Sequence, residues 1–255
     1  MRPNPVKTKL AAGETVYGTM IFEFLSPGLP RILANSGADF ALYDLEHSGF
    51  TIEDMKTQFA LCAAVGLVPL VRPPGKAYNF TARLLDVGAF GLLYQMVGSA
   101  EEARELVSWT RYPPDGVRGA VFGGAHDDYT GGEMADKAAA AMARTFTLAL
   151  IETKAGLDNI DEIMAVDGID AAHLGHADLS LSLGIPGQFD HPDLQRGIDK
   201  IVEAAAKVGK AAGAMAPTLE WGQDLLNRGY RMISYNHDMG LLGDGLTAGI
   251  KALKG

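Results

Sequence analysis

The sequence lacks the features that mark disulfide-rich, membrane and nucleic-acid-binding proteins. Its only cysteine, Cys62, cannot form an intramolecular disulfide, and its apolar neighbours predict a buried structural thiol in a reducing compartment. The most apolar stretch, residues 59–71, contains a glycine and a proline and is too short to span a membrane. No run of lysine and arginine occurs, and the formal charge is −9, so neither a nucleic acid nor a membrane is an expected partner.

The rest of the composition is that of an ordinary folded protein. Of the 255 residues, 47% are apolar and 21% are charged, which excludes disordered and collagen-like chains. The N-terminal segment 1–13 has basic residues but no apolar core after them, so no signal peptide is expected and we predict a cytoplasmic protein. No repeat, linker or change of composition marks a second domain. We therefore expect one domain over residues 1–255.

Eight short apolar segments alternate with amphipathic segments along the chain. The predicted strands are Val16–Ile21, Phe40–Glu46, Val68–Arg72, Gly91–Met96, Phe146–Glu152, Ala171–Gly175, Ala211–Ala216 and Met232–Asn236. This alternation is typical of parallel strands joined by right-handed crossovers. Eight such units favour a single closed (β/α)₈ TIM barrel. A Rossmann-type sheet is disfavoured because no G-x-G-x-x-G follows the first strand. Residues 111–136 are irregular and are predicted to form a long loop.

Carboxylates follow two neighbouring predicted strands, at the barrel end where such enzymes carry their chemistry. Glu152 ends the fifth strand and Asp178 follows the sixth. Two carboxylates with open positions for water and substrate suit a hard cation such as Mg²⁺ or Mn²⁺. No cysteine cluster and no His-x-x-x-His supports a closed zinc site. Each acid could instead cap the helix that follows it, and the sequence leaves this alternative open.

Other polar residues near the same strand ends are candidates for acid–base chemistry and anion binding. His47 follows the second strand and titrates nearest neutral pH, whereas Arg72 ends the third and needs an anionic partner. Asp86, in the helix before the fourth strand, could orient an imidazole. A structural histidine, a salt bridge and a surface acid are the respective alternatives. Lys154 is a poorer candidate for a Schiff base than for a solvated helix residue. The residues alone predict a metal-assisted reaction on a small anion.

Six short motifs appear in order along the chain. They are Asp44-x-Glu46-His47, Val71-Arg72-Pro73, Leu84-Leu85-Asp86-Val87-Gly88, Arg111-Tyr112-Pro113-Pro114-x-Gly116-x-Arg118-Gly119, Ile151-Glu152-Thr153 and Gly175-x-Ala177-Asp178-Leu179-Ser180. Over about residues 18–242 this series resembles the HpcH/HpaI aldolase family of metal-dependent (class II) pyruvate aldolases. The resemblance implies a (β/α)₈ barrel, commonly a hexamer with exchanged terminal helices. It also implies reversible cleavage of a 4-hydroxy-2-oxoacid to pyruvate and an aldehyde.

The resemblance assigns roles to the candidate metal and substrate ligands. Glu152 and Asp178 would hold the divalent cation, Mg²⁺ or Mn²⁺, with Co²⁺ or others possible. The cation would chelate the 2-oxo and carboxylate oxygens and stabilise the pyruvate enolate. Backbone amides near Ala177 and Asp178 would receive the substrate carboxylate at a helix N-terminus.

The resemblance likewise assigns the acid–base roles. His47 would be the general base, and Asp86 would raise its basicity, within its own chain or near a neighbour's site. Arg72 would stabilise the developing oxyanion.

Several positions depart from the family pattern. Leu150 replaces a glutamine, Gln95 begins a segment that is usually Pro-Met-Val, and residues 235–238 replace a Val-Gly-Val-Asp end. His176 replaces a proline and is expected either to bind substrate at the mouth of the metal site, where it can donate a hydrogen bond or titrate near neutral pH, or to turn outward and pack. We interpret these changes as an altered substrate with retained activity.

Three functions remain open at this point. The first is an aldolase with oxoacid and aldehyde substrates. The second is a related carbon–carbon lyase or condensing enzyme that acts on oxaloacetate or a citrate-like acid. The third is a non-catalytic barrel that binds an oxoacid. The resemblance implies a homo-oligomer, most simply a hexamer, and the apolar C-terminal segment 241–253, which can pack on a partner, supports this expectation.

Overall fold

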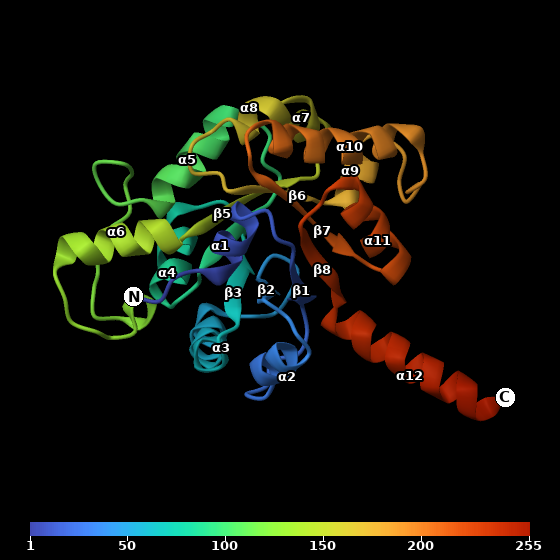
Figure 1. Ribbon diagram of the computed structural model, residues 1–255, viewed down its shortest axis with the longest axis horizontal. Helices are drawn as coiled ribbons and strands as arrows, with labels where there is room; N and C mark the ends of the chain where they lie inside the picture. Colours follow the sequence, from blue (N-terminus) through green and yellow to red (C-terminus); the bar gives the residue numbers. More distant parts are fainter.

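The computed structural model describes residues 1–255, and its eight strands pair in parallel and in chain order to close a barrel (Figure 1). The strands are β1 (Val16–Ile21), β2 (Phe40–Asp44), β3 (Val68–Arg72), β4 (Gly91–Tyr94), β5 (Phe146–Ile151), β6 (Ala171–Leu174), β7 (Ala211–Ala216) and β8 (Met232–His237). The ladder from β8 back to β1 completes the circle. The predicted (β/α)₈ barrel is confirmed.

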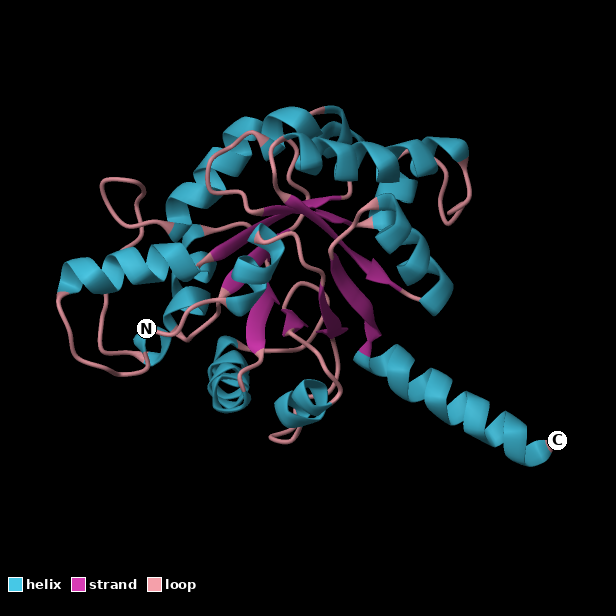
Figure 2. Ribbon diagram, in the orientation of Figure 1, coloured by secondary structure: helices cyan, strands magenta, loops and turns pink.

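Helices surround the sheet on its outer side (Figure 2). They are α1 (Pro5–Ala11), α2 (Leu29–Asn35), α3 (Ile52–Val65), α4 (Tyr78–Asp86), α5 (Ala100–Thr110), α6 (Met134–Arg144), α7 (Lys154–Asp158), α8 (Ile160–Met164), α9 (His176–Ser182), α10 (Pro192–Lys207), α11 (Leu219–Arg228) and α12 (Asp238–Lys254). Side-chain caps fix several starts: Ser99 and Thr218 accept backbone N–H groups of α5 and α11. The capped start of each helix ends the polar loop that leaves the strand before it.

Four predicted strands end earlier than expected, all at the same end of the barrel. Residues 45–46, 95–96, 152 and 175 lie beyond the ladders rather than in them. The cause is visible after β2, where the Asp44 carboxylate accepts the N–H groups of Glu46 and His47 and turns the chain. Polar residues that leave the ladder in this way are free to face the barrel mouth.

Two apolar cores hold the barrel together. A smaller one fills its interior, and a larger one lies between the strands and the surrounding helices. Glycine is required where the interior is tightest, because a Cβ on Gly18 or Gly91 would lie within 2.4 Å of a neighbouring carbonyl oxygen. Cys62 is buried in the outer core, and burial raises its thiol pKa to about 11. The predicted buried thiol is confirmed.

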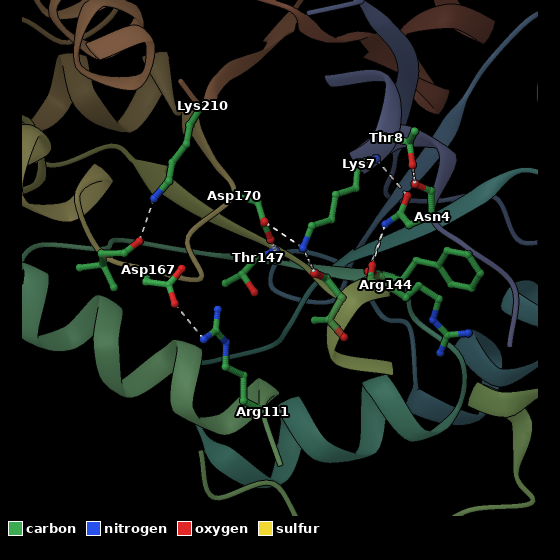
Figure 3. Close-up of polar contacts among 12 residues, drawn as sticks. Asn4, Lys7, Thr8, Arg111, Arg144, Thr147, Asp167, Asp170 and Lys210 are labelled. Atoms are coloured by element: carbon green, nitrogen blue, oxygen red, sulfur yellow. Dashed lines mark hydrogen bonds and ion pairs between the residues drawn. The ribbon is translucent and has the colours of Figure 1, made fainter. Parts of the chain in front are cut away.

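Polar contacts close the N-terminal end of the barrel (Figure 3). The Asn4 side chain donates to the Arg144 carbonyl at 3.0 Å. Lys7 on α1 donates to the Thr145 carbonyl at 2.9 Å and pairs with Asp170 at 3.0 Å. These bonds anchor α1 across the strand starts, an end of the barrel that ordinarily serves stability. The opposite end is left as the open face.

The C-terminal helix α12 points away from the barrel (Figure 1). Residues 241–255 are all exposed, and Leu242, Leu246, Ile250 and Leu253 recur at the spacing of one helix face. None of the helices combines the length and the apolar composition needed to cross a membrane.

Candidate functional site

A cavity opens at the C-terminal ends of the strands. Among the residues that line it are six of the seven that the sequence predicted for the site, namely His47, Arg72, Glu152, His176, Ala177 and Asp178. They come from the ends of β2, β3 and β5 and from the start of α9. The strand ends therefore bring together residues that are up to 131 positions apart in the sequence, between His47 and Asp178. Asp86 is the exception.

A buried ion-pair network fixes one wall of this cavity. Arg72 and Asp44 face each other across the β2–β3 ladder, with 2.9 Å between Arg72 Nε and Asp44 Oδ1 and a second bond from the guanidinium to Oδ2. Glu46 forms an ion pair with the same guanidinium, with 3.2 Å between Arg72 Nη1 and Glu46 Oε2, and this Oε2 lies 3.5 Å from His47 Nε2. The two-point bond holds the guanidinium in a fixed plane. Asp44 and Glu46 thus position Arg72 and His47.

Breaking this pair is expected to destabilise the fold. Asp44→Asn leaves the Arg72 guanidinium, which is 7% exposed, without its buried counter-charge. We expect the free energy of unfolding to fall by about 3–5 kcal/mol in urea titrations. Asp193→Asn, which breaks an exposed pair with Arg196, should cost less than about 1 kcal/mol. Equal losses in the two variants would contradict a buried, structurally essential pair.

Glu152 presents a nearly buried carboxylate to the cavity, with 3% of the residue exposed. Its Oε1 accepts the N–H of Met96 at 2.7 Å. Gly175 lets the side chain lie close against β6, because a Cβ there would lie 2.8 Å from Glu152 Oε2. Burial raises the Glu152 pKa to about 7, and the nearby Asp178 charge adds to the rise. A carboxylate that is costly to ionise here is one that a cation would stabilise.

The pair Glu152 and Asp178 fits a hard divalent cation. Glu152 has one oxygen held by the backbone and the other without a hydrogen-bond donor, and Asp178 lies in the first turn of α9 beside it. No third histidine, cysteine or carboxylate joins them to complete a closed site. Two carboxylate ligands with further positions for water and substrate oxygens are what Mg²⁺ takes at such sites. The donor set therefore agrees with the predicted ligands.

The raised Glu152 pKa has a consequence for the metal-free protein. The folded state binds the proton of the Glu152 carboxyl group more tightly than the unfolded chain does. The protonated carboxyl group therefore contributes its full share to the free energy of unfolding below the ordinary pKa of 4.5. This contribution is lost as the pH rises towards about 7, and the free energy of unfolding falls by about 3 kcal/mol. Urea unfolding in chelator, from pH 4.5 to 8, should show this loss in the parent and not in Glu152→Gln. Parallel profiles would refute it.

His176 combines the two alternatives open at the sequence level. Its ring lines the cavity and also packs between Phe189 and Trp221, with ring centroids 5.2 and 4.6 Å away. Burial lowers its pKa below the ordinary value. Burial disfavours the charged form of the imidazole, which favours the predicted role of a hydrogen-bond donor over that of a titrating group. A contact between His176 and substrate stays a prediction.

The segments that depart from the family pattern also lie near the cavity. Asp238, the one residue of the 235–238 segment that keeps the family's aspartate, follows β8, and its carboxylate accepts three N–H groups, of Phe22, Glu23 and Phe24, at 2.8–3.1 Å. It thereby holds Phe22 in the cavity wall. Gln95 is buried and donates to the Pro73 carbonyl at 3.1 Å, and Leu150 lines the cavity.

Asp86, for which action within its own chain or near a neighbour's site was left open, does not line the cavity of its own chain. Asp86 is the last residue of α4, and a barrel helix ends beside the start of the next strand, at the end opposite the cavity. There it pairs with Arg118, from the loop between α5 and α6, at 2.7 Å. Within this chain, the partner of His47 is Glu46.

The structure brings to the site three residues for which no role was predicted from the sequence. Asp44 and Glu46 belong to a quoted motif, and their period-two spacing from Leu42 is the signal that places Asp44 inside the barrel. The third is His173 on β6, which lines the cavity floor.

Comparison with known proteins gives consistent results. A family model described as HpcH/HpaI aldolase/citrate lyase matches residues 20–244. A 2-keto-3-deoxy-L-rhamnonate aldolase of Klebsiella pneumoniae is 38% identical over 239 residues, which cover 91% of this chain and 89% of that protein.

Two solved structures extend the similarity. An HpcH/HpaI aldolase from Desulfitobacterium hafniense superposes with a TM-score of 0.93 at 33% identity, over 98% of this chain and 96% of that one. The citrate synthase SbnG superposes with a TM-score of 0.85 at 27% identity, over 98% and 97%.

Proposed function

Because the chain belongs to the HpcH/HpaI aldolase/citrate lyase family, we propose that it cleaves a 4-hydroxy-2-oxoacid reversibly to pyruvate and an aldehyde, with the help of a divalent metal. The family and the enzyme class predicted from the sequence, a carbon–carbon lyase, are confirmed. One observation supports the assignment of this function to particular residues. Arg72, Glu152, Asp178 and His47 line a single cavity at the catalytic end of a TIM barrel.

Glu152 and Asp178 would hold the metal, which is Mg²⁺ or Mn²⁺ in this proposal. When bound, such a cation polarises the 2-oxo group and so makes a proton on the adjacent carbon more acidic. Burial of Glu152 supports this assignment, since a cation offsets the cost of its charge.

Arg72 and the start of α9 bind and orient the oxoacid. The guanidinium, fixed by Asp44, would donate to the oxygen on which negative charge develops. The amides of Ala177 and Asp178 lie in the first turn of α9, where N–H groups have no acceptor within the helix. They would receive the substrate carboxylate. His176, in the same turn, would contact the acceptor aldehyde.

His47 would move the proton of the reacting hydroxyl. Its side chain is 58% exposed and stands at the mouth of the cavity, on the side from which an aldehyde enters. In the cleavage direction the imidazole accepts the 4-hydroxyl proton, and the Glu46 carboxylate lies 3.5 Å from its Nε2. Asp86 would act on this chemistry only across a subunit boundary, at a neighbouring molecule's site.

The test is proton exchange at the oxoacid. With Mn²⁺ or Mg²⁺ in D₂O, the protein should exchange the methyl protons of pyruvate, and a panel of aldehydes should then yield adducts. Chelator should abolish both activities. Borohydride with pyruvate should leave the protein active, because the best-placed lysine, Lys154, is exposed and paired with Asp158. Chelator-resistant exchange, or covalent trapping of a lysine, would overturn the proposal.

A condensing enzyme or lyase acting on oxaloacetate or a citrate-like acid is the second candidate. It is favoured by the similarity to the citrate synthase SbnG and uses the same first step. Exchange without any aldehyde adduct, followed by condensation with a second oxoacid, would select it. A non-catalytic barrel would show no exchange at all.

We also propose that the protein is a cytoplasmic homo-oligomer, most simply a hexamer, in which α12 packs on a second copy. The exposed apolar face of α12, formed by residues 242, 246, 250 and 253, supports this arrangement because a helix needs such a face covered. The buried, reduced Cys62 suits the cytoplasm. Light scattering at micromolar concentration measures the mass directly.

A further inference from the structure

The floor of the cavity carries a polar side chain that the proposed mechanism does not use. His173 on β6 lines the cavity, is 2% exposed, and has neither ring nitrogen hydrogen-bonded within the protein. A buried polar group without a partner is destabilising, so it calls for an explanation, which at the wall of a cavity can be a bound ligand. Leu93, Leu150 and Met215, which line the same cavity, offer no alternative partner.

His173 lies deeper in the barrel than the groups that hold the oxoacid. It pairs in register with Leu150 on β5, whereas Glu152 follows the last residue of that strand. On the other side its register partner is Gly213 of β7, where a Cβ would meet the imidazole at 3.1 Å. The glycine thus makes room for the ring. His47 stands at the opposite, exposed end of the same cavity.

The depth of His173 identifies the part of the substrate that can reach it. The aldehyde half enters from the mouth, beside His47, so the floor is accessible only to the oxoacid half. The keto carbon of that half has three substituents. The carboxylate is directed to α9 and the oxygen to Arg72, which leaves the third, C3, to point towards the floor.

We propose that His173 hydrogen-bonds a hydroxyl group on C3 of the oxoacid, so that the preferred substrates are 3,4-dihydroxy-2-oxoacids and the product released is 3-hydroxypyruvate. This inference rests on the proposed function but replaces pyruvate by 3-hydroxypyruvate as the released oxoacid, and it sets the substrate apart from the 3-deoxy acid named for the Klebsiella pneumoniae relative. The C3–C4 bond breaks and its electron pair forms the enolate. The 4-hydroxyl proton passes to the base as the aldehyde leaves, and C3 then takes up a proton.

A hydroxyl group matches the imidazole better than a methyl group or a second carboxylate. Burial lowers the His173 pKa to about 3, and Arg72 adds to this effect, so the ring is neutral and offers one donor and one acceptor. A hydroxyl can accept from one ring nitrogen or donate to the other. A methyl group would leave both unpaired, and a carboxylate would need a positive charge that the ring does not carry.

The test compares two oxoacids on the metal-loaded protein. Exchange of the C3 protons of pyruvate and of 3-hydroxypyruvate is followed by NMR in D₂O, corrected for exchange without protein. We expect kcat/KM to favour 3-hydroxypyruvate at least about tenfold. In His173→Leu this ratio should fall about 10- to 100-fold, mainly through a higher KM for 3-hydroxypyruvate, with pyruvate exchange retained. His173→Gln, which keeps a donor and an acceptor, should restore part of the preference.

His126→Leu is the matched control. His126 is also a buried imidazole with both nitrogens unpartnered, but it lies in the loop between α5 and α6 and does not line the cavity. Its replacement should leave the ratio unchanged. A parent protein that prefers pyruvate, or a ratio unaffected in His173→Leu, would overturn the inference while leaving the aldolase proposal intact. No exchange with either acid would overturn the aldolase proposal itself, and this inference with it.

Discussion

Replacing Glu152 with glutamine is expected to abolish measurable oxoacid proton exchange and to weaken Mn²⁺ binding by more than about a hundredfold. Losing a residue that only supports a ligand already costs 10- to 100-fold in affinity, and the loss of a ligand should cost more. The amide keeps the size of the side chain but removes the charge that the cation would neutralise. Titration with Mn²⁺, followed by electron paramagnetic resonance or calorimetry, measures the affinity separately from turnover.

The control for this variant is Glu203→Gln, which makes the same substitution at an exposed residue of α10. It should bind Mn²⁺ and exchange protons like the parent. A Glu152→Gln protein that bound the metal with parental affinity would mean that Glu152 is not a ligand. The assignment of the metal to the pair with Asp178 would then have to be abandoned.

His47→Ala should lower turnover by about 10²–10⁴, the usual range for the loss of a general base, with little change in metal affinity. The affinity is the informative readout, because a ligand and a base both lower turnover but only a ligand lowers affinity. His191→Ala, at the N-cap of α10 and outside the cavity, is the control and should retain turnover. Loss of the metal from His47→Ala would identify His47 as a ligand and exclude the base role.

The fold could be predicted from the sequence because the alternation of strands and helices is regular and each strand is apolar. The candidate site followed largely from it, since strand ends in a barrel converge wherever they lie in the chain. Glu152, Asp178 and Arg72 were found on this basis. Asp86 was correctly expected in the helix before the fourth strand, but which subunit's site it serves could not be predicted from the sequence. As the last residue of α4, Asp86 lies at the N-terminal end of the barrel, where each helix leads into the next strand, and this end is opposite the cavity.

The residues that were missed have a common physical cause. Barrel strands are buried on both faces, so their sequences do not alternate between polar and apolar residues, and period-two spacing identifies an inward residue only once another residue of that face is known. In Ala171–Leu174 the histidine looks like a core residue of either face. The partner of Arg72 was equally hidden, because Asp44 becomes its neighbour only through the β2–β3 register. Register is a property of the closed sheet.

The projecting C-terminal helix makes part of this protein's secondary structure depend on its concentration. Residues 241–255 have no buried side chain to hold them, and Gly243, Gly245 and Gly249 each weaken a helix by about 1 kcal/mol relative to alanine. A segment of this length is marginal as an isolated helix in water. Its order must then be set by mass action between molecules rather than by the barrel. Dilution should reduce the helical far-ultraviolet circular dichroism signal of residues 241–255 while the barrel stays folded. The helicity of this segment would then report the degree of oligomerisation.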